Sequence, residues 1–146
     1  MTLREERAGA ALEHYPRTFR VRALYSDMDA FRHVNNIAIA RWFEEARADL
    51  NMEVFGRSAM IDPGDQQLLI ASARFEYLDQ VRYPSDVTIA SGVGRIGSSS
   101  YVLSHALVRD GICAALADTV MVKAVAGRPT ALDADERSRL TALALA

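Results

Sequence analysis

The sequence has few of the residues that would indicate a disulfide framework, a thiolate metal site or a nucleic-acid-binding surface. Its only cysteine is Cys113, so no intrachain disulfide can form and no thiolate cluster can hold a metal. The net charge is −2 and no basic block occurs, which argues against a protein that binds nucleic acid by neutralising many phosphates. These absences suit a reducing compartment and leave room for a small or phosphate-tailed ligand.

Long apolar runs are also absent. Residues 1–16 lack the apolar stretch of a signal peptide, and no window approaches the ~18 apolar residues of a membrane span. We therefore expect a cytoplasmic protein that does not enter a membrane. The length of 146 residues, half of them apolar, suits one domain with one core. We expect residues 1–16 to form an N-terminal arm and residues 17–146 to form the domain.

The spacing of apolar residues predicts one strand, one long helix and four further strands. Residues 18–25 alternate with a period near two, which indicates a half-buried strand. From Asn36 to about Phe55 the apolar residues recur every three or four positions, which is typical of an amphipathic helix, here ending before Gly56. We expect the four later strands at residues 68–77, 86–96, 99–109 and 112–125.

Two local motifs define the end of the domain. Asp110-Gly111 predicts a tight antiparallel hairpin between the last two strands. Asp133 with Glu136 three residues later is typical of a capping box, so a short C-terminal helix is expected, as a peripheral lid or a frayed end.

A helix of about twenty residues and a strand of nine or ten both span roughly 30 Å. The element order therefore predicts an α+β domain whose antiparallel sheet curls around one central helix.

The loop at residues 25–36 concentrates polar groups beside the start of the long helix. The free backbone N–H groups of a helix start carry partial positive charge and can hold a carbonyl oxygen that becomes negative. Asp29, placed opposite, could activate water as a general base or attack the carbonyl itself. An alternative is that Asp27 and Asp29 are turn residues and that Asn35 and Asn36 only cap the helix.

A metal site is not expected in this loop, because two aspartates and His33 without a second cluster form a weak ligand set. His33 itself is equally compatible with packing. Two other polar residues lie on strands. Asp118 falls on an apparently apolar strand face, where it needs a partner, and His105 has the pattern of a packed histidine.

Residues 21–50 resemble the 4-hydroxybenzoyl-CoA thioesterase family. The resemblance rests on Tyr25-Ser26-Asp27-Met28-Asp29, His33-Val34-Asn35-Asn36 and Arg41-Trp42-Phe43-Glu44-Glu45-Ala46-Arg47, and it extends more loosely through residues 83–86, 95–100 and the final strand. It implies a hotdog fold with a five-stranded antiparallel sheet around one long helix, together with acyl-CoA hydrolysis. It also implies active sites assembled between two subunits. Because such a sheet exposes long edge strands and outer apolar residues, we expect a homodimer or a homotetramer. No cofactor is expected, since CoA is part of the substrate.

The resemblance also implies roles for individual residues. Asp29 is the second aspartate of the motif and would be the catalytic carboxylate. The backbone amide at or near Asn36 would polarise the thioester carbonyl, while His33 and Asn35 would shape the pocket and Asp27 would be structural.

Two positions depart from the family pattern. Many members have glycine where Arg32 stands and tyrosine where Ile39 stands. Arg32 could stabilise the negative charge of Asp29, contact an acidic substrate or simply face solvent. Ile39 hints at an apolar acyl group.

The sequence signal for CoA-binding residues is weaker than the signal for the loop. Arg95, Ser98 and Ser99 are candidates because arginines near strand ends and small residues suit phosphates and a pantetheine arm. Each is also compatible with an ordinary strand-end position. Two other functions stay open: a non-catalytic acyl-CoA sensor, and a hydratase or dehydratase of the same fold.

Overall fold

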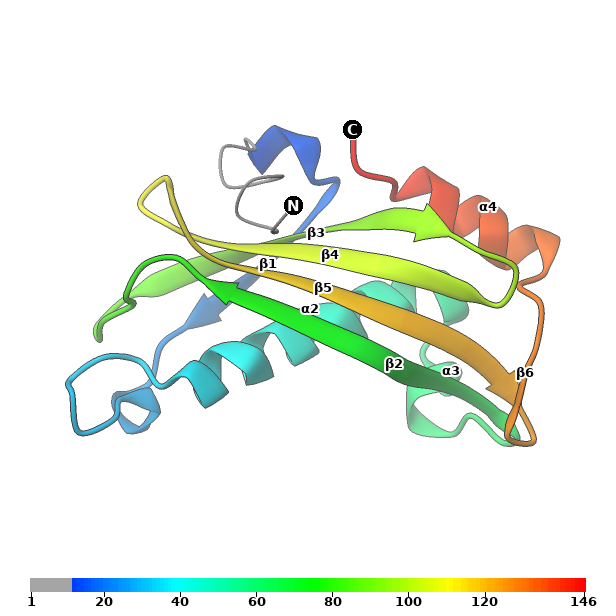
Figure 1. Ribbon diagram of the computed structural model, residues 1–146, viewed down its shortest axis with the longest axis horizontal. Helices are drawn as coiled ribbons and strands as arrows, with labels where there is room; N and C mark the ends of the chain where they lie inside the picture. The colour runs from blue at the N-terminus through cyan, green and yellow to red at the C-terminus, as the bar shows by residue number, and fades with distance from the viewer. Residues whose placement is uncertain (1–11) are drawn as a thin grey trace.

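A long helix lies across one face of a curled antiparallel sheet in the computed structural model, which describes residues 12–146 (Figure 1). The helix is α2 (Asn36–Phe55). The strands are β1 (Arg17–Arg22), β2 (Gln66–Tyr77), β3 (Asp86–Ile96), β4 (Ser100–Arg109) and β5 (Ile112–Val125), in the order β1-β3-β4-β5-β2, and the two-residue β6 (Arg128–Pro129) pairs with β5. The remaining elements are η1 (Leu12–His14), η2 (Tyr25–Asp27), α3 (Ser58–Ile61) and α4 (Ala134–Ala142).

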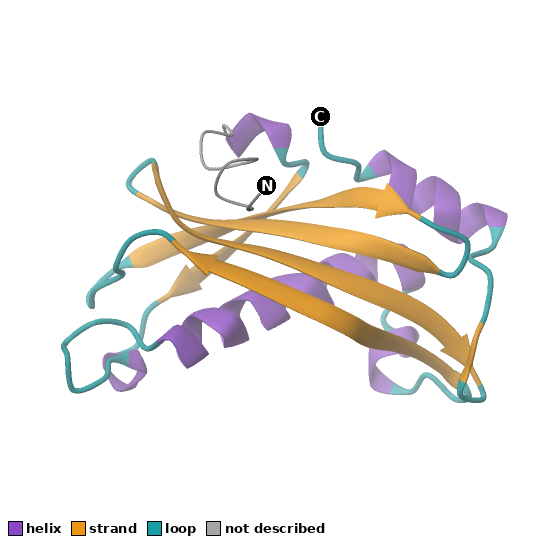
Figure 2. Cartoon of the chain, in the orientation of Figure 1, coloured by secondary structure: helices purple, strands orange, loops and turns teal. Residues whose placement is uncertain are grey.

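This arrangement confirms the expected hotdog fold, shown by element type in Figure 2. The helix α2 ends where predicted because Gly56 takes a φ of 86°, which a residue with a side chain rarely adopts. Asp110 and Gly111 have φ values of 49° and 76° and form the predicted hairpin turn. The first strand ends earlier than expected, at Arg22, and the turn η2 follows from Tyr25.

The core lies between α2 and the sheet. Phe43, Leu50 and Val54 of α2 are completely buried, and their spacing of seven and four residues keeps them on one side of the helix. They pack with buried residues of the central strands, among them Ile89 of β3 and Leu103 of β4. Burial along the whole length of α2 fixes both ends of the helix relative to the sheet. No helix among residues 12–146 is long and apolar enough to span a membrane.

The two edges of the sheet differ in length and in how far they are covered. The edge strand β1 has only six residues, three of them arginines, and beyond it Leu143 and Leu145 exchange backbone hydrogen bonds with Val93 of β3. The opposite edge strand, β2, has twelve residues and no strand on its outer side among the described residues. Short, charged or covered edges resist pairing with another chain, whereas a long open edge invites it.

The C-terminal helix is not the lid or frayed end that we expected. Leu140 of α4 is completely buried in the same cluster as Leu50 and Val54 of α2. The capping box is present, since Asp133 accepts from the Glu136 N–H and Glu136 accepts from the Asp133 N–H. Glu136 also accepts a 2.6 Å hydrogen bond from Lys123 of β5, and both side chains are buried. These contacts make α4 an integral part of the core.

The proposed arm at residues 1–16 lies partly outside the described residues, which begin at Leu12. Its described part packs against the outer face of the sheet, where Tyr15 is buried beside Ala90, Ala106 and Leu116. The carbonyl of His14 also accepts a hydrogen bond from the backbone of Ala146. Residues 12–16 therefore belong to the packed domain.

The buried position of Leu140 gives a direct test of the role of α4. We expect Leu140→Ala to lower the free energy of unfolding by about 2–5 kcal/mol, the cost of a cavity in a packed core. Leu12→Ala is the matched control, because Leu12 is 40% exposed, and it should change stability by no more than about 0.5 kcal/mol. Urea unfolding followed by circular dichroism measures both. Equal, small effects would mean that α4 is detached in solution.

Candidate active site

The polar loop before α2 forms a small hairpin. Met28 and Val34 pair as an antiparallel bridge, and the Asp29 N–H donates to the carbonyl of His33 at 2.9 Å. The loop is also tied to the segment before β3, because the Val34 N–H donates to the Val81 carbonyl at 2.7 Å. These bonds hold Asp29 opposite His33, which is three residues before the first residue of α2.

Asp27 has the structural role that we expected. Its side chain is buried, and one carboxylate oxygen accepts from the backbone of Leu24 at 2.8 Å while the other accepts from the Arg41 guanidinium at 2.7 Å. Its carbonyl accepts from the Asn35 N–H at 2.8 Å. Asp27 therefore joins the turn η2, the hairpin and the first part of α2, and both of its carboxylate oxygens are engaged in these contacts.

The start of α2 is capped by Asn35 and leaves a backbone amide without a partner among the described residues. Asn35 is the N-cap, and its side-chain oxygen accepts from the Ile37 N–H at 2.8 Å. Among the described residues, no partner is found for the N–H of Asn36, the first residue of α2. A free amide at this position carries the positive end of the helix dipole.

Tyr77 at the end of β2 is a neighbour that the sequence did not reveal. Its hydroxyl donates to the carbonyl of Asn36 at 3.3 Å. The Tyr77 hydroxyl is a donor at neutral pH, as is usual for tyrosine, and partial burial raises its pKa further. The only sequence signal was its place as the last residue of a predicted strand.

Asp29 is only partly buried and lines an open cavity of about 500 Å³ with Tyr25, Met28, Arg32, Arg82 and Tyr83. One of its carboxylate oxygens accepts from the Phe31 N–H at 2.9 Å, so Asp29 does serve as a turn residue. The side chains of Phe31 and Ile37 nearby are 79% and 71% exposed. A polar carboxylate beside exposed apolar groups suits a ligand with an apolar part, or a covering protein surface.

Arg32 occupies a left-handed backbone position, with a φ of 61°. Glycine adopts this conformation without steric cost, which explains in physical terms why a glycine suits this position. Arg32 lines the same cavity as Asp29, but the ion pairs found within residues 12–146 do not include one between these two side chains. The Arg32 guanidinium therefore stays a candidate for contact with substrate.

Ile39 does not support the hint of an apolar acyl pocket. Its side chain is buried in the core cluster with Trp42 and Phe43 of α2, so it does not line the cavity around Asp29.

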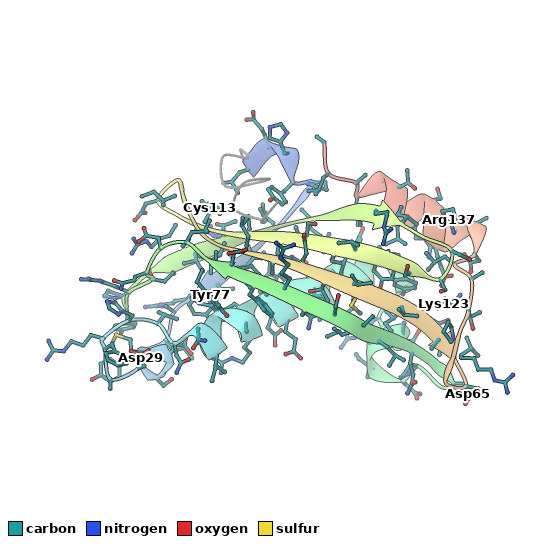
Figure 3. All side chains as sticks on the ribbon, in the orientation of Figure 1. Asp29, Asp65, Tyr77, Cys113, Lys123 and Arg137 are labelled. Atoms are coloured by element: carbon teal, nitrogen blue, oxygen red, sulfur yellow. The ribbon has the colours of Figure 1, made fainter. Side chains whose placement is uncertain are left out.

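The candidate CoA residues lie far from Asp29 within one chain. β3 begins beside Arg22, near the hairpin, and runs for eleven residues to Ile96, a distance of roughly 33 Å at the usual rise of a strand. Arg95 therefore lies near the distant end of β3, and Ser98 and Ser99 follow in the next turn. Figure 3 shows Asp29 at one end of the molecule and Arg137, whose guanidinium donates to the Gly97 and Ser98 carbonyls, at the other. One chain alone does not bring these residues together.

Asp118 and His105, the two polar strand residues noted in the sequence, both have partners within the chain. Asp118 is partnered, since it accepts a 2.6 Å hydrogen bond from the Ser104 hydroxyl. His105 is completely buried, bonds Ser91 at 2.7 Å and packs against Phe43. Within residues 12–146, no group of three or more His, Cys, Asp or Glu side chains is arranged to hold a metal ion.

The chain matches one family model and is similar to several solved structures. Residues 24–140 match the family model of the thioesterase-like superfamily. The fold is similar to that of the PA5185 protein from Pseudomonas aeruginosa strain PAO1, with a TM-score of 0.83 and 26% identity over 93% of this chain and 96% of that one. A thioesterase from Thermus thermophilus, complexed with coenzyme A and zinc, has a TM-score of 0.80 and 27% identity over 90% and 96% of the two chains. No curated protein matches the sequence significantly.

The contacts of Asp27 predict that it stabilises the loop. Asp27→Asn should lower the free energy of unfolding by about 1–3 kcal/mol, because it weakens charge-assisted hydrogen bonds to a buried acceptor. Asp29→Asn, two residues away and partly exposed, should change stability by less than about 0.5 kcal/mol. Thermal and urea unfolding of the two variants give the comparison. A larger loss for Asp29→Asn would reverse these assignments.

Proposed function

The chain belongs to the thioesterase-like superfamily, and from this premise we propose that it hydrolyses an acyl-CoA thioester to a free carboxylic acid and CoA. Asp29 is the proposed catalytic carboxylate. The observation that carries the proposal is the hairpin that holds Asp29 opposite His33, three residues before the capped start of α2, where the Asn36 N–H is unpaired among the described residues.

The proposed reaction uses these two groups together. The Asn36 N–H and the dipole of α2 stabilise the negative charge that develops on the thioester oxygen. Asp29 either removes a proton from the attacking water or attacks the carbonyl to form an anhydride that water then hydrolyses. In both routes the thiolate of CoA leaves and takes up a proton. Tyr77 holds the Asn36 carbonyl and so positions the first turn of α2.

We further propose a homodimer, or a tetramer of two such dimers, paired through β2. A two-fold axis makes such pairing antiparallel, so the start of β2 in one copy lies beside the end of β2 in the other. The end of β2 carries Tyr77 and adjoins the hairpin, whereas its start pairs with the end of β5, near Ser98 and Ser99. Pairing therefore brings Arg95, Ser98 and Ser99 of one copy toward Asp29 of the other. This supports an active site shared between subunits and a role for these three residues in binding CoA.

The first test is thiol release from a panel of aliphatic and aromatic acyl-CoAs. We expect the wild type to release CoA and Asp29→Asn to be at least ~100-fold slower, because the amide can serve neither as base nor as nucleophile. A disulfide reagent follows the free thiol, and circular dichroism checks that the variant is folded.

The outcomes separate the alternatives. Equal rates for the two proteins would remove Asp29 from the mechanism. Binding of acyl-CoA without release by either protein would favour a sensor. Conversion of an enoyl-CoA without thiol release would favour a hydratase. The resemblance to 4-hydroxybenzoyl-CoA thioesterases concerns the loop rather than the acyl group, so the panel must include both classes of substrate.

The second test concerns the open edge. Ala71 is exposed near the middle of β2, at an irregularity in its pairing with β5. Ala71→Lys would place two like charges near the two-fold axis, and we expect the dissociation constant of the dimer to rise at least about tenfold. Ala142→Lys, at the exposed end of α4, is the control. Sedimentation equilibrium measures both, and a wild type that is monomeric at micromolar concentration would exclude this dimer.

A further inference from the structure

A second cavity, of about 360 Å³, lies between α2, α3 and the start of β2, away from the Asp29 hairpin. Its walls include Met60 of α3 and Leu69 and Ile70 of β2, which are apolar. α2 contributes two buried polar residues to the lining, Arg47 and Asn51. The cavity thus combines an apolar wall with polar groups on one side.

Arg47 is the unusual member of this lining. The residue is only 8% exposed, yet its guanidinium has no hydrogen bond or ion pair within the described part of the chain. Burial lowers the pKa of Arg47, while the negative charge of Glu44 acts in the opposite sense. Glu44 also lines the cavity, but it is exposed to solvent. Arg47 is not among the described residues that have a fully enclosed, unpartnered side-chain nitrogen, so its donors are open to the cavity and can bind an acceptor there.

Asn51 presents a second donor. Its side-chain oxygen accepts a 2.8 Å hydrogen bond from the Tyr101 hydroxyl, so the remaining polar group of its amide is the NH2. The planar guanidinium of arginine matches a carboxylate, which can accept two parallel hydrogen bonds. The chemistry of the cavity therefore fits a short apolar chain that ends in a carboxylate.

The place of the cavity connects it with the hairpin of a second copy. It adjoins Gln67, Leu68, Leu69 and Ile70 at the start of β2, whereas Tyr77 and the start of α2 lie at the other end of the strand. If two copies pair antiparallel through β2, each cavity lies beside the Asp29 hairpin of the partner. An acyl group attacked there can extend into the cavity.

We propose that this cavity receives the acyl chain of the substrate and that Arg47 binds a carboxylate at its far end. The enzyme would then prefer the CoA thioesters of dicarboxylic acids. This inference rests on the proposed thioesterase function and adds its substrate class. Asn51 donates beside Arg47, and the apolar residues of β2 and α3 contact the methylene groups.

The test compares two substrates of equal chain length, glutaryl-CoA and pentanoyl-CoA, which differ by a terminal carboxylate. We expect the wild type to have a kcat/KM about tenfold to a hundredfold higher for glutaryl-CoA, the range of a charge-assisted hydrogen bond. Arg47→Met keeps the volume and removes the charge, so it should abolish the preference by slowing glutaryl-CoA hydrolysis alone. Arg57→Gln is the control, because Arg57 is exposed next to α3 and does not line the cavity.

The proposal is overturned if the wild type prefers pentanoyl-CoA, or if folded Arg47→Met slows both substrates equally. If Arg47→Met does not fold, Arg47→Lys replaces it. This variant keeps the charge without the planar fork, and it should lose at least about fivefold of the preference.

Binding of glutarate, followed by calorimetry, separates the inference from the proposed function. If the wild type hydrolyses no thioester but binds glutarate, and Arg47→Met does not, the thioesterase proposal fails while the carboxylate site stands. If glutarate does not bind to the wild type either, the site fails too.

Discussion

The burial of one face of α2 along the sheet is the constraint on which the rest of the molecule depends. Phe43, Leu50 and Val54 fix the helix over its whole length, so neither end can move without opening the core. The first turn is thereby held against the Asp29 hairpin, and the second half of the helix holds Arg47 in the wall of the cavity beside α3. A single packed element positions both the proposed reacting groups and the proposed specificity residue.

Asp27 connects the loop to the packed helix α2 through its hydrogen bonds with Arg41 and Asn35. Without it, the hairpin would be tied to the domain mainly through Val34, since the hydrogen bonds found for Asp29 lie within the hairpin. The two aspartates are two residues apart and have different environments: one is buried and fully engaged, and the other lines a cavity with one oxygen in a turn. The left-handed position of Arg32 closes the same turn at some conformational cost.

The sequence predicted most of the fold because its signals were local. Gly56, Asp110-Gly111 and the Asp133 capping box each set the backbone within a few residues, and the periodicity of α2 follows from one continuous buried face. The role of α4 was predicted wrongly because it depends on Leu140 meeting α2 residues about ninety positions earlier. Tyr77 and the environment of Arg47 were missed for the same reason: both are defined by contacts between β2 or α3 and α2, which no single window of sequence contains.

In the proposed dimer paired through the open edge of β2, each active site takes residues from both copies. With the pairing proposed here, each reaction centre takes Asp29 from one copy and Arg47 from the other, so the two copies exchange parts rather than duplicate them. A copy defective in Asp29 and a copy defective in Arg47, each impaired toward dicarboxylic thioesters when alone, would together rebuild one intact centre in a mixed dimer. In this proposed dimer one gene would encode a chain that contributes one half to each of two active sites, and complementation between two defective chains would be its experimental signature.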